Sequence, residues 1–103
     1  MEKSKQSYIL KDVKESIKQG KIITPNIKVI ASANEIGFSE TEAYDEILKL
    51  VHNSFYKSMT ENYNHKVWQD VYKAKIRNLP IYIKFQIIDG KFLLRSFKPN
   101  EQA

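Results

Sequence analysis

The sequence predicts an α+β fold in which N-terminal helices pack on one face of an antiparallel β-sheet. Apolar residues recur at helical spacing up to about residue 51, and from residue 53 they alternate with a period of two. Helices followed by antiparallel strands are typical of this class, with the helices covering the apolar face of the sheet. We therefore expect one domain over 1–103, with helices at about 8–51, a sheet at about 54–98 and a frayed tail at 99–103.

The first half predicts three helices. A first helix ends at Gly20, and a second starts after Pro25 and ends near Gly37. Ser39 and Glu42 have the spacing of a capping box, which opens a third helix. Each helix has an apolar face that we expect to form core: Tyr8, Ile9, Val13, Ile17 and Ile22 in the first, Ile27, Ile30, Ala31 and Asn34 in the second, and Ala43, Ile47, Leu50 and Val51 in the third.

The second half predicts strands at 54–59, 65–73, 81–88 and 92–97. A turn at 78–80 separates the second strand from the third, and Asp89-Gly90 is a hairpin signal. In the third strand Tyr82, Lys84 and Gln86 share the face opposite to the apolar one, which holds Ile81, Ile83, Phe85 and Ile87. The polar face is therefore open to water or to a ligand. On the second strand Trp68 and Tyr72 alternate away from Gln69 and are expected to pack under the helices.

The net charge of +5 lies entirely in the predicted sheet half. Residues 1–53 hold eight lysines and eight acidic residues, whereas residues 54–103 hold nine lysines or arginines and four acidic residues. A positive field confined to one part of a domain favours a polyanion or an acidic partner, although a solvated lysine-rich surface gives the same count.

Several classes of function are excluded or disfavoured by composition. The chain has no cysteine, which excludes disulfides and thiolate metal sites, and its two histidines disfavour a histidine-rich metal centre. We expect no metal and no cofactor. No apolar run approaches the roughly 20 residues of a membrane span, and the N-terminus is polar, so a cytoplasmic location without membrane contact is expected.

Four polar residues interrupt the predicted strands: Lys57, Gln69, Tyr82 and Lys84. RNA cleavage without a metal needs proton carriers for the 2′-hydroxyl and the 5′-oxygen, and cations or donors for the phosphorane. Lys57 can supply positive charge to the phosphoryl oxygens and, if its pKa is lowered, can also shuttle a proton. Gln69 can orient the 2′-hydroxyl or bind a phosphate oxygen or a base. Tyr82 acts as acid or base if neighbouring lysines ease its ionisation. Without a catalytic role, Lys57 would be a solvated cation, Gln69 an amide on an edge strand and Tyr82 a half-buried tyrosine of the sheet.

The chain contains the segments FYKSMT at 55–60 and WQDVY at 68–72, with His65 between them. They are followed by Tyr82-Ile83-Lys84 and by Ser96-Phe97-Lys98. Together they resemble the motility quorum-sensing regulator toxins (MqsR), which have a RelE-like fold. The resemblance runs from about residue 54 to residue 98 and more weakly through the N-terminal part, at Met1-Glu2-Lys3, Val13-Lys14 and Gly20.

This resemblance implies a ribosome-independent mRNA interferase, an endoribonuclease that cuts mRNA at short sites containing GC. It also implies a cognate antitoxin that contains zinc and binds DNA. Carried over by position, the family's catalytic residues fall on Lys57, Gln69 and Tyr82, and a terminal lysine near the cleft falls on Lys98. We add Lys84 and His65 as RNA-binding residues, and expect the free toxin to be a monomer.

The register of the last hairpin decides the role of Lys98, because a shift of one residue moves every side chain to the other face. A two-residue Asp89-Gly90 loop sends Lys98 to the face opposite Tyr82, whereas a three-residue loop with a glycine bulge keeps both on one face. We favour the bulge, since the other register exposes Phe97 and buries Lys98. It leaves Arg95 facing the helices.

Some alternatives remain open at the level of sequence. The same basic face suits a non-catalytic nucleic-acid-binding regulator, or an inactive toxin relative that only binds its partner. His65 has a simpler reading as a turn-capping residue, and Phe55 and Tyr56 suit either base stacking or core packing. The cleaved trinucleotide and the general base are not determined.

Overall fold

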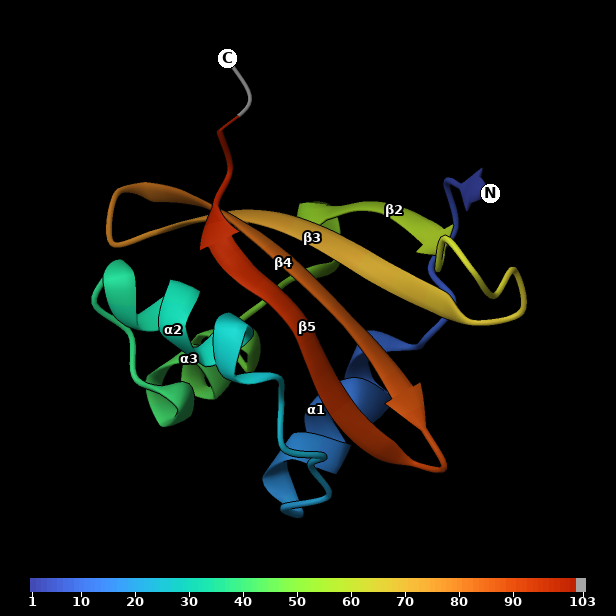
Figure 1. Ribbon diagram of the computed structural model, residues 1–103, viewed down its shortest axis with the longest axis horizontal. Coiled ribbons are helices and arrows are strands. Elements are labelled where there is room, and N and C mark those ends of the chain that lie inside the picture. The colour runs from blue at the N-terminus through green and yellow to red at the C-terminus, as the bar shows by residue number, and fades with distance from the viewer. Residues whose placement is uncertain (102–103) are drawn as a thin grey trace.

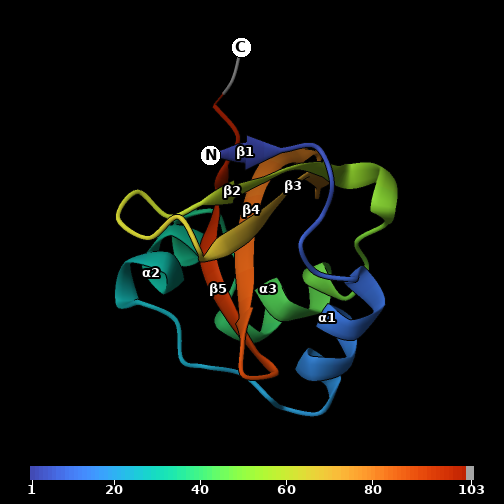
Figure 2. The ribbon, with the colours of Figure 1, turned by 90° about the vertical axis from the view of Figure 1, so that its right-hand side faces the viewer.

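The computed structural model describes residues 1–101 and has the predicted α+β architecture: three helices cover one face of a five-stranded antiparallel sheet (Figures 1 and 2). The strands lie in chain order, β1-β2-β3-β4-β5. The elements in order are β1 (Glu2–Lys3), α1 (Leu10–Lys18), α2 (Ile27–Glu35), α3 (Glu40–Ile47), a 3-10 turn η1 (His52–Ser54), β2 (Phe55–Thr60), β3 (Trp68–Ile76), β4 (Leu79–Ile88) and β5 (Lys91–Pro99).

The core lies between the helices and the apolar face of the sheet. Phe85 stacks on Tyr72 at 5.5 Å between ring centroids and contacts Phe92 at 5.3 Å, and an edge-on pair of Phe38 and Phe97 closes the side under α2. Aromatic pairs of this kind add roughly 0.5–1.5 kcal/mol each to the burial of their surface. The expected packing of Tyr72 under the helices is confirmed, whereas Trp68 is only partly buried.

Helix α1 begins later than its apolar pattern predicts. Tyr8 and Ile9 precede it. Ile9 is the N-cap residue, whose carbonyl oxygen accepts the first helical hydrogen bonds, and its side chain is exposed. Ile22 lies beyond the helix and forms a parallel bridge to Phe92 of β5. The buried face of α1 consists of Leu10, Val13 and Ile17.

The predicted face of α2 is wrong. Ile27, Ala31 and Asn34 are exposed, and the helix buries Ala33 instead. The Ser32 hydroxyl donates a hydrogen bond of 3.0 Å to the Phe97 carbonyl oxygen, which turns the neighbouring face toward β5. A nine-residue helix with few strong apolar positions does not define one stripe, so its tertiary contacts decide its orientation.

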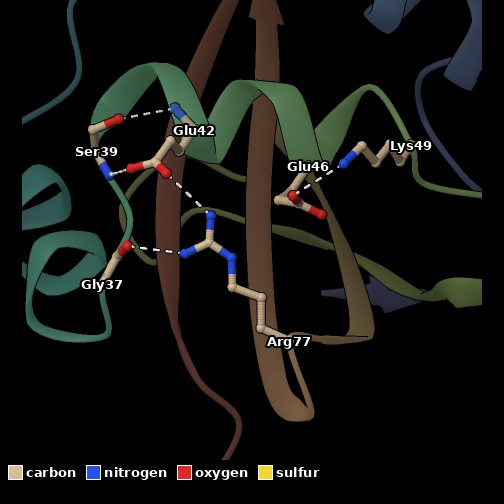
Figure 3. Close-up of polar contacts among 6 residues, drawn as sticks. All are labelled: Gly37, Ser39, Glu42, Glu46, Lys49 and Arg77. Atoms are coloured by element: carbon tan, nitrogen blue, oxygen red, sulfur yellow. Dashed lines mark hydrogen bonds and ion pairs between the residues drawn. The ribbon is translucent and has the colours of Figure 1, made fainter.

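Helix α3 begins at the predicted capping box, in which the Ser39 hydroxyl accepts from the Glu42 backbone N–H and the Glu42 carboxylate accepts from that of Ser39 (Figure 3). Arg77 extends this cap, because its guanidinium donates to Glu42 at 3.1 Å and to the Gly37 carbonyl oxygen at 3.1 Å (Figure 3). The helix ends at Ile47; Leu50 is still buried, but Val51, which we assigned to the core, is exposed.

The strand boundaries differ from the predicted ones most at the start and end of β3, at the start of β4 and at the end of β5. Strand β3 begins at Trp68, so His65 lies in the preceding loop. The turn before β4 consists of Arg77 and Asn78, both with positive φ, and β4 starts immediately after it. Pro99 belongs to β5, so the tail predicted at 99–103 is paired at its start; residues 102–103 lie outside the described part of the chain.

A buried carboxylate anchors the segment that leads from β1 to α1. Asp70 of β3 is fully buried, and its oxygens accept from the backbone N–H groups of Ser7 at 3.0 and 3.1 Å and of Tyr8 at 3.0 Å. The Ser7 hydroxyl also lies 2.7 Å from that of Ser58 on β2. This attachment holds β1, which the sequence pattern did not predict, beside β2. Within residues 1–101, no helix is long and apolar enough to cross a membrane.

Candidate active site

The candidate site lies on the open face, which we define as the sheet face turned away from the helices (Figure 2). A β-bulge brings Lys57 to it. Phe55 pairs with Tyr72 but Lys57 pairs with Val71, so Tyr56 is an extra residue in β2. Phe55 packs against the core, Tyr56 is 46% exposed, and Lys57 turns outward. If Tyr56 were paired in a regular strand and not bulged, alternation from Phe55 would direct Lys57 toward the helices.

A second bulge brings Lys98 to the same face. Lys84 pairs with Ser96 but Phe85 pairs with Leu94, so Arg95 is an extra residue in β5. Lys98 consequently pairs with Tyr82 across the two strands, as we predicted. The reason that we gave was wrong, however.

The Asp89-Gly90 loop has two residues, with Ile88 pairing with Lys91 and positive φ at both loop positions. This is the geometry of a tight hairpin with no glycine bulge. The parity is corrected within the strand instead, and Arg95 is exposed rather than facing the helices. Phe97 remains fully buried, which is the packing that the bulge preserves.

The side chains of the open face form a dense cluster of cations and phenols. The Lys57 ammonium lies 2.6 Å from a carboxylate oxygen of Glu2, and 5.4 Å from the ring centroid of Tyr56. The Lys73 ammonium lies over the same ring at 3.5 Å, and that of Lys98 lies 5.4 Å from the centroid of the Tyr82 ring. A hollow of about 540 Å³ adjoins Tyr82 and Lys98. The cluster thus offers several cations to one polyanionic ligand.

The structure assigns protons to two of the predicted catalytic residues. Burial raises the pKa of the Tyr82 phenol, and the ammonium of Lys57 offsets this rise only in part. The hydrogen bond to Glu2 raises the pKa of Lys57. The conditions under which Lys57 would shuttle a proton and Tyr82 would ionise easily, a lowered pKa in each case, are therefore not met. Because both groups keep their protons at neutral pH, Lys57 suits charge stabilisation and Tyr82 suits proton donation.

Lys84 is the lysine of this face whose pKa is lowered. Burial disfavours its charged form, and the cations of Arg95 and Lys98 add to the effect. A phosphate that binds among these three groups would relieve their mutual repulsion. Lys84 therefore has the environment of an anion-binding residue.

Gln69 and His65 fare differently from the lysines. Gln69 is 3% exposed and its amide nitrogen donates to the Gln86 side-chain oxygen at 3.0 Å, so it lies within the sheet surface and not at an edge. His65 is exposed in the loop between β2 and β3, and no contact joins it to Lys57 or Tyr82 among the described residues. The structure thus brings together Lys57, Tyr82, Lys84 and Lys98, places Gln69 beneath the surface, and leaves His65 apart.

The residue that the sequence interpretation missed is Glu2. Its strand has only two residues, which is too short to show the alternation by which strands are predicted from sequence. The only signal was the partial resemblance of the first three residues to the family named above.

A larger cavity of about 660 Å³ lies elsewhere, between the N-terminal segment and the adjoining ends of β3 and β4. Trp68 lines it, with the Lys3 ammonium 4.1 Å from its ring centroid. This cavity lacks Lys57, Tyr82 and Lys98, so volume alone does not mark the candidate site. In the described part of the chain, no group of three His, Asp or Glu side chains is arranged to hold a metal ion.

Fold and site together define a class: a small basic α+β protein that presents lysines and a tyrosine on an open sheet face, as a phosphodiester-binding protein does. The family described as the motility quorum-sensing regulator, toxin of MqsA, matches residues 5–99. The chain is also 33% identical over 98 residues to the mRNA interferase toxin MqsR of Escherichia coli (strain K12), an alignment that covers 95% of this chain and 98% of that protein. The chain therefore belongs to the motility quorum-sensing regulator toxin family, and by that membership it is a toxin endoribonuclease.

Proposed function

We propose that this chain is a ribosome-independent mRNA interferase that cleaves mRNA at short GC-containing sites without a metal ion. The reaction would leave a 2′,3′-cyclic phosphate. A cognate antitoxin that contains zinc and binds DNA would neutralise it, and the free toxin would act as a cytoplasmic monomer. The observation that carries the proposal is that bulges in β2 and β5 bring Lys57 and Lys98 to the face of Tyr82.

Each residue of the cluster has a role in the proposed reaction. The Lys57 ammonium stabilises the charge that develops on the phosphoryl oxygens, a contribution whose loss commonly lowers the rate about 10²–10³-fold. The Tyr82 phenol protonates the 5′-oxygen as it leaves. Lys84 and Lys98 bind phosphates of the RNA strand. Gln69 orients the 2′-hydroxyl or binds a phosphate oxygen, after exchanging its bond to Gln86 for one to RNA.

The exposed loop between β2 and β3 gives His65 a separate role in this proposal. Its imidazole would contact RNA beyond the reacting phosphate, since the loop stands at one end of the open face. Replacing His65 would then weaken RNA binding with little effect on the chemical step.

The test is cleavage of a GC-containing RNA by purified protein in EDTA, with mapping of the product ends. Lys57→Ala and Tyr82→Phe are each expected to lower kcat about 10²–10⁴-fold. The matched controls are Lys11→Ala, an exposed lysine on the helical side, and Tyr63→Phe, a fully exposed loop tyrosine; both are expected to cleave normally.

Two results would contradict the proposal. Cleavage abolished by EDTA would show that the mechanism needs a metal. RNA that is retarded in a gel but stays intact, with equal retardation by Tyr82→Phe, would favour a non-catalytic regulator that uses the same basic face. Neutralisation is tested by adding the product of a neighbouring reading frame that encodes a Cys-rich, DNA-binding protein.

A further inference from the structure

The candidate site lacks an assigned proton acceptor. Transesterification at RNA needs one group that takes the proton of the 2′-hydroxyl and another that supplies a proton to the 5′-oxygen. Tyr82 and Lys57 both carry their protons at neutral pH, for the reasons given above. Two proton donors without an acceptor leave the attacking hydroxyl inactive, so a further group is required.

Glu2 has the position that this role requires. It pairs with Met59 and so projects onto the open face, where its carboxylate lies 2.6 Å from the Lys57 ammonium. It faces the ammonium of Lys57 on β2, and lies close enough to the Tyr82 phenol of β4 to help raise its pKa. An ordinary glutamate is ionised at neutral pH and can accept a proton.

The short strand that carries Glu2 is attached on both sides of this residue. The Met1 ammonium donates to the Thr60 hydroxyl oxygen at 3.0 Å, and the Lys3 ammonium lies over the Trp68 ring at 4.1 Å. Five residues further on, the Asp70 carboxylate holds the backbone of Ser7. Terminal residues are usually poorly ordered unless they are tied down, and here the attachments fix the carboxylate at the cluster.

We propose that Glu2 is a catalytic residue, the proton acceptor for the attacking 2′-hydroxyl; this inference rests on the proposed ribonuclease function. The 2′-O–H bond breaks as its proton passes to the Glu2 carboxylate, and the 2′-oxygen forms a bond to phosphorus. The P–O5′ bond then breaks, and the 5′-oxygen takes the proton of the Tyr82 phenol. The products are a 2′,3′-cyclic phosphate and a 5′-hydroxyl, and the proton on Glu2 returns to Tyr82 through solvent.

Binding of the substrate prepares Glu2 for this step. In the free protein Lys57 gives a charge-assisted hydrogen bond to Glu2, and a phosphate that binds Lys57 competes for that ammonium. A carboxylate that loses a donor and gains an anionic neighbour becomes a stronger base. The exchange therefore frees a carboxylate oxygen of Glu2 to accept from the 2′-hydroxyl as it arrives.

The test compares Glu2→Gln, Glu2→Asp and the control Glu15→Gln, an exposed acid on α1, in the full chain with no tag before Met1. We measure kcat and KM from about pH 5 to about pH 9, together with binding of an uncleavable 2′-deoxy analogue. Glu2→Gln is expected to lower kcat about 10²–10⁴-fold, to bind the analogue as tightly as wild type or more tightly, and to lose the acidic limb of the pH–rate profile. Glu2→Asp is expected to retain the limb with a smaller loss of rate.

Three outcomes would overturn the inference. Unchanged or higher kcat in Glu2→Gln with tighter binding would make Glu2 only a counter-ion that RNA displaces. A lower kcat with an intact acidic limb and a matching loss of unfolding free energy would make it a structural anchor. If neither wild type nor Glu15→Gln cleaves RNA, the proposed function itself fails. If both of them cleave RNA, Tyr82→Phe does not cleave it and Glu2→Gln still cleaves it, only the role of Glu2 fails.

Discussion

Deletion of Arg95 tests whether this residue is the extra one that the bulge in β5 accommodates. Arg95 is the extra residue between Leu94, which faces the helices, and Ser96, which pairs with Lys84 on the open face. Removing it leaves a strand that alternates regularly, with Phe97 still in the core and Lys98 still opposite Tyr82. We therefore expect the unfolding free energy to change by no more than about 1 kcal/mol, a typical value for a change outside the core.

Deletion of Leu93 is the matched control, because it removes one residue from the same strand on the other side of the bulge. Regular pairing then sends Leu94, which is 2% exposed, onto the open face and turns Arg95 toward the helices. Exposing a buried leucine costs about 1.5–3 kcal/mol, and directing a guanidinium inward adds to this. A loss of about 3 kcal/mol or more is expected, which in a domain of this size lowers Tm by roughly 12–24 °C.

Urea unfolding followed by far-UV circular dichroism and by the fluorescence of Trp68 measures both variants. Leu93→Ala supplies the cost of losing that side chain alone, which is subtracted from the result for its deletion. RNA cleavage by the Arg95 deletion checks that Lys98 has stayed in place. The reasoning is refuted if the Arg95 deletion is as destabilised as the Leu93 deletion, or if it is stable but has lost the contribution of Lys98.

Three further predictions concern single side chains. Asp70→Asn is expected to lose about 3 kcal/mol of unfolding free energy, because an amide nitrogen would replace one of the two oxygens that accept from the N–H groups of Ser7 and Tyr8. Equal stability in urea would contradict the anchoring role. Burial raises the pKa of Tyr72 from 10.0 to about 12, so the folded protein keeps this proton longer and its stability falls between about pH 10 and about pH 12. The hydroxyl of Tyr72 is buried and has no hydrogen-bond partner within residues 1–101. Tyr72→Phe is therefore expected to be as stable as wild type or about 1 kcal/mol more stable at neutral pH, and to lose less stability at alkaline pH. A variant that is less stable at neutral pH would reveal a hydrogen bond to that hydroxyl. Lys84→Met removes a cation held near Arg95 and Lys98, so its unfolding free energy is expected to rise by up to about 1 kcal/mol at low salt and its RNA binding to weaken. If neither change is observed, Lys84 is not an anion-binding residue.

The sequence by itself determined the fold class and most of the core. The change of period near residue 53 separates helices from strands, and the alternation of Ile81, Ile83 and Phe85 marks the helix-facing side of β4, since a strand half buried by helices must be apolar on one face. The capping box of Ser39 and Glu42 was also readable, because it depends on residues three positions apart. Local rules of this kind need no tertiary information.

Only the tertiary structure decided which residues share the site. The bulges at Tyr56 and Arg95 arise because Phe55 and Phe97 must stay in the core, and an extra residue is tolerated where it can protrude into solvent. Neither bulge is visible as a local signal, yet each reverses the face of the lysine that follows it. The same holds for Glu2, whose place beside Lys57 depends on the pairing of β1 with β2 and on the contact of Ser7 with Asp70, which are 63 residues apart in the chain.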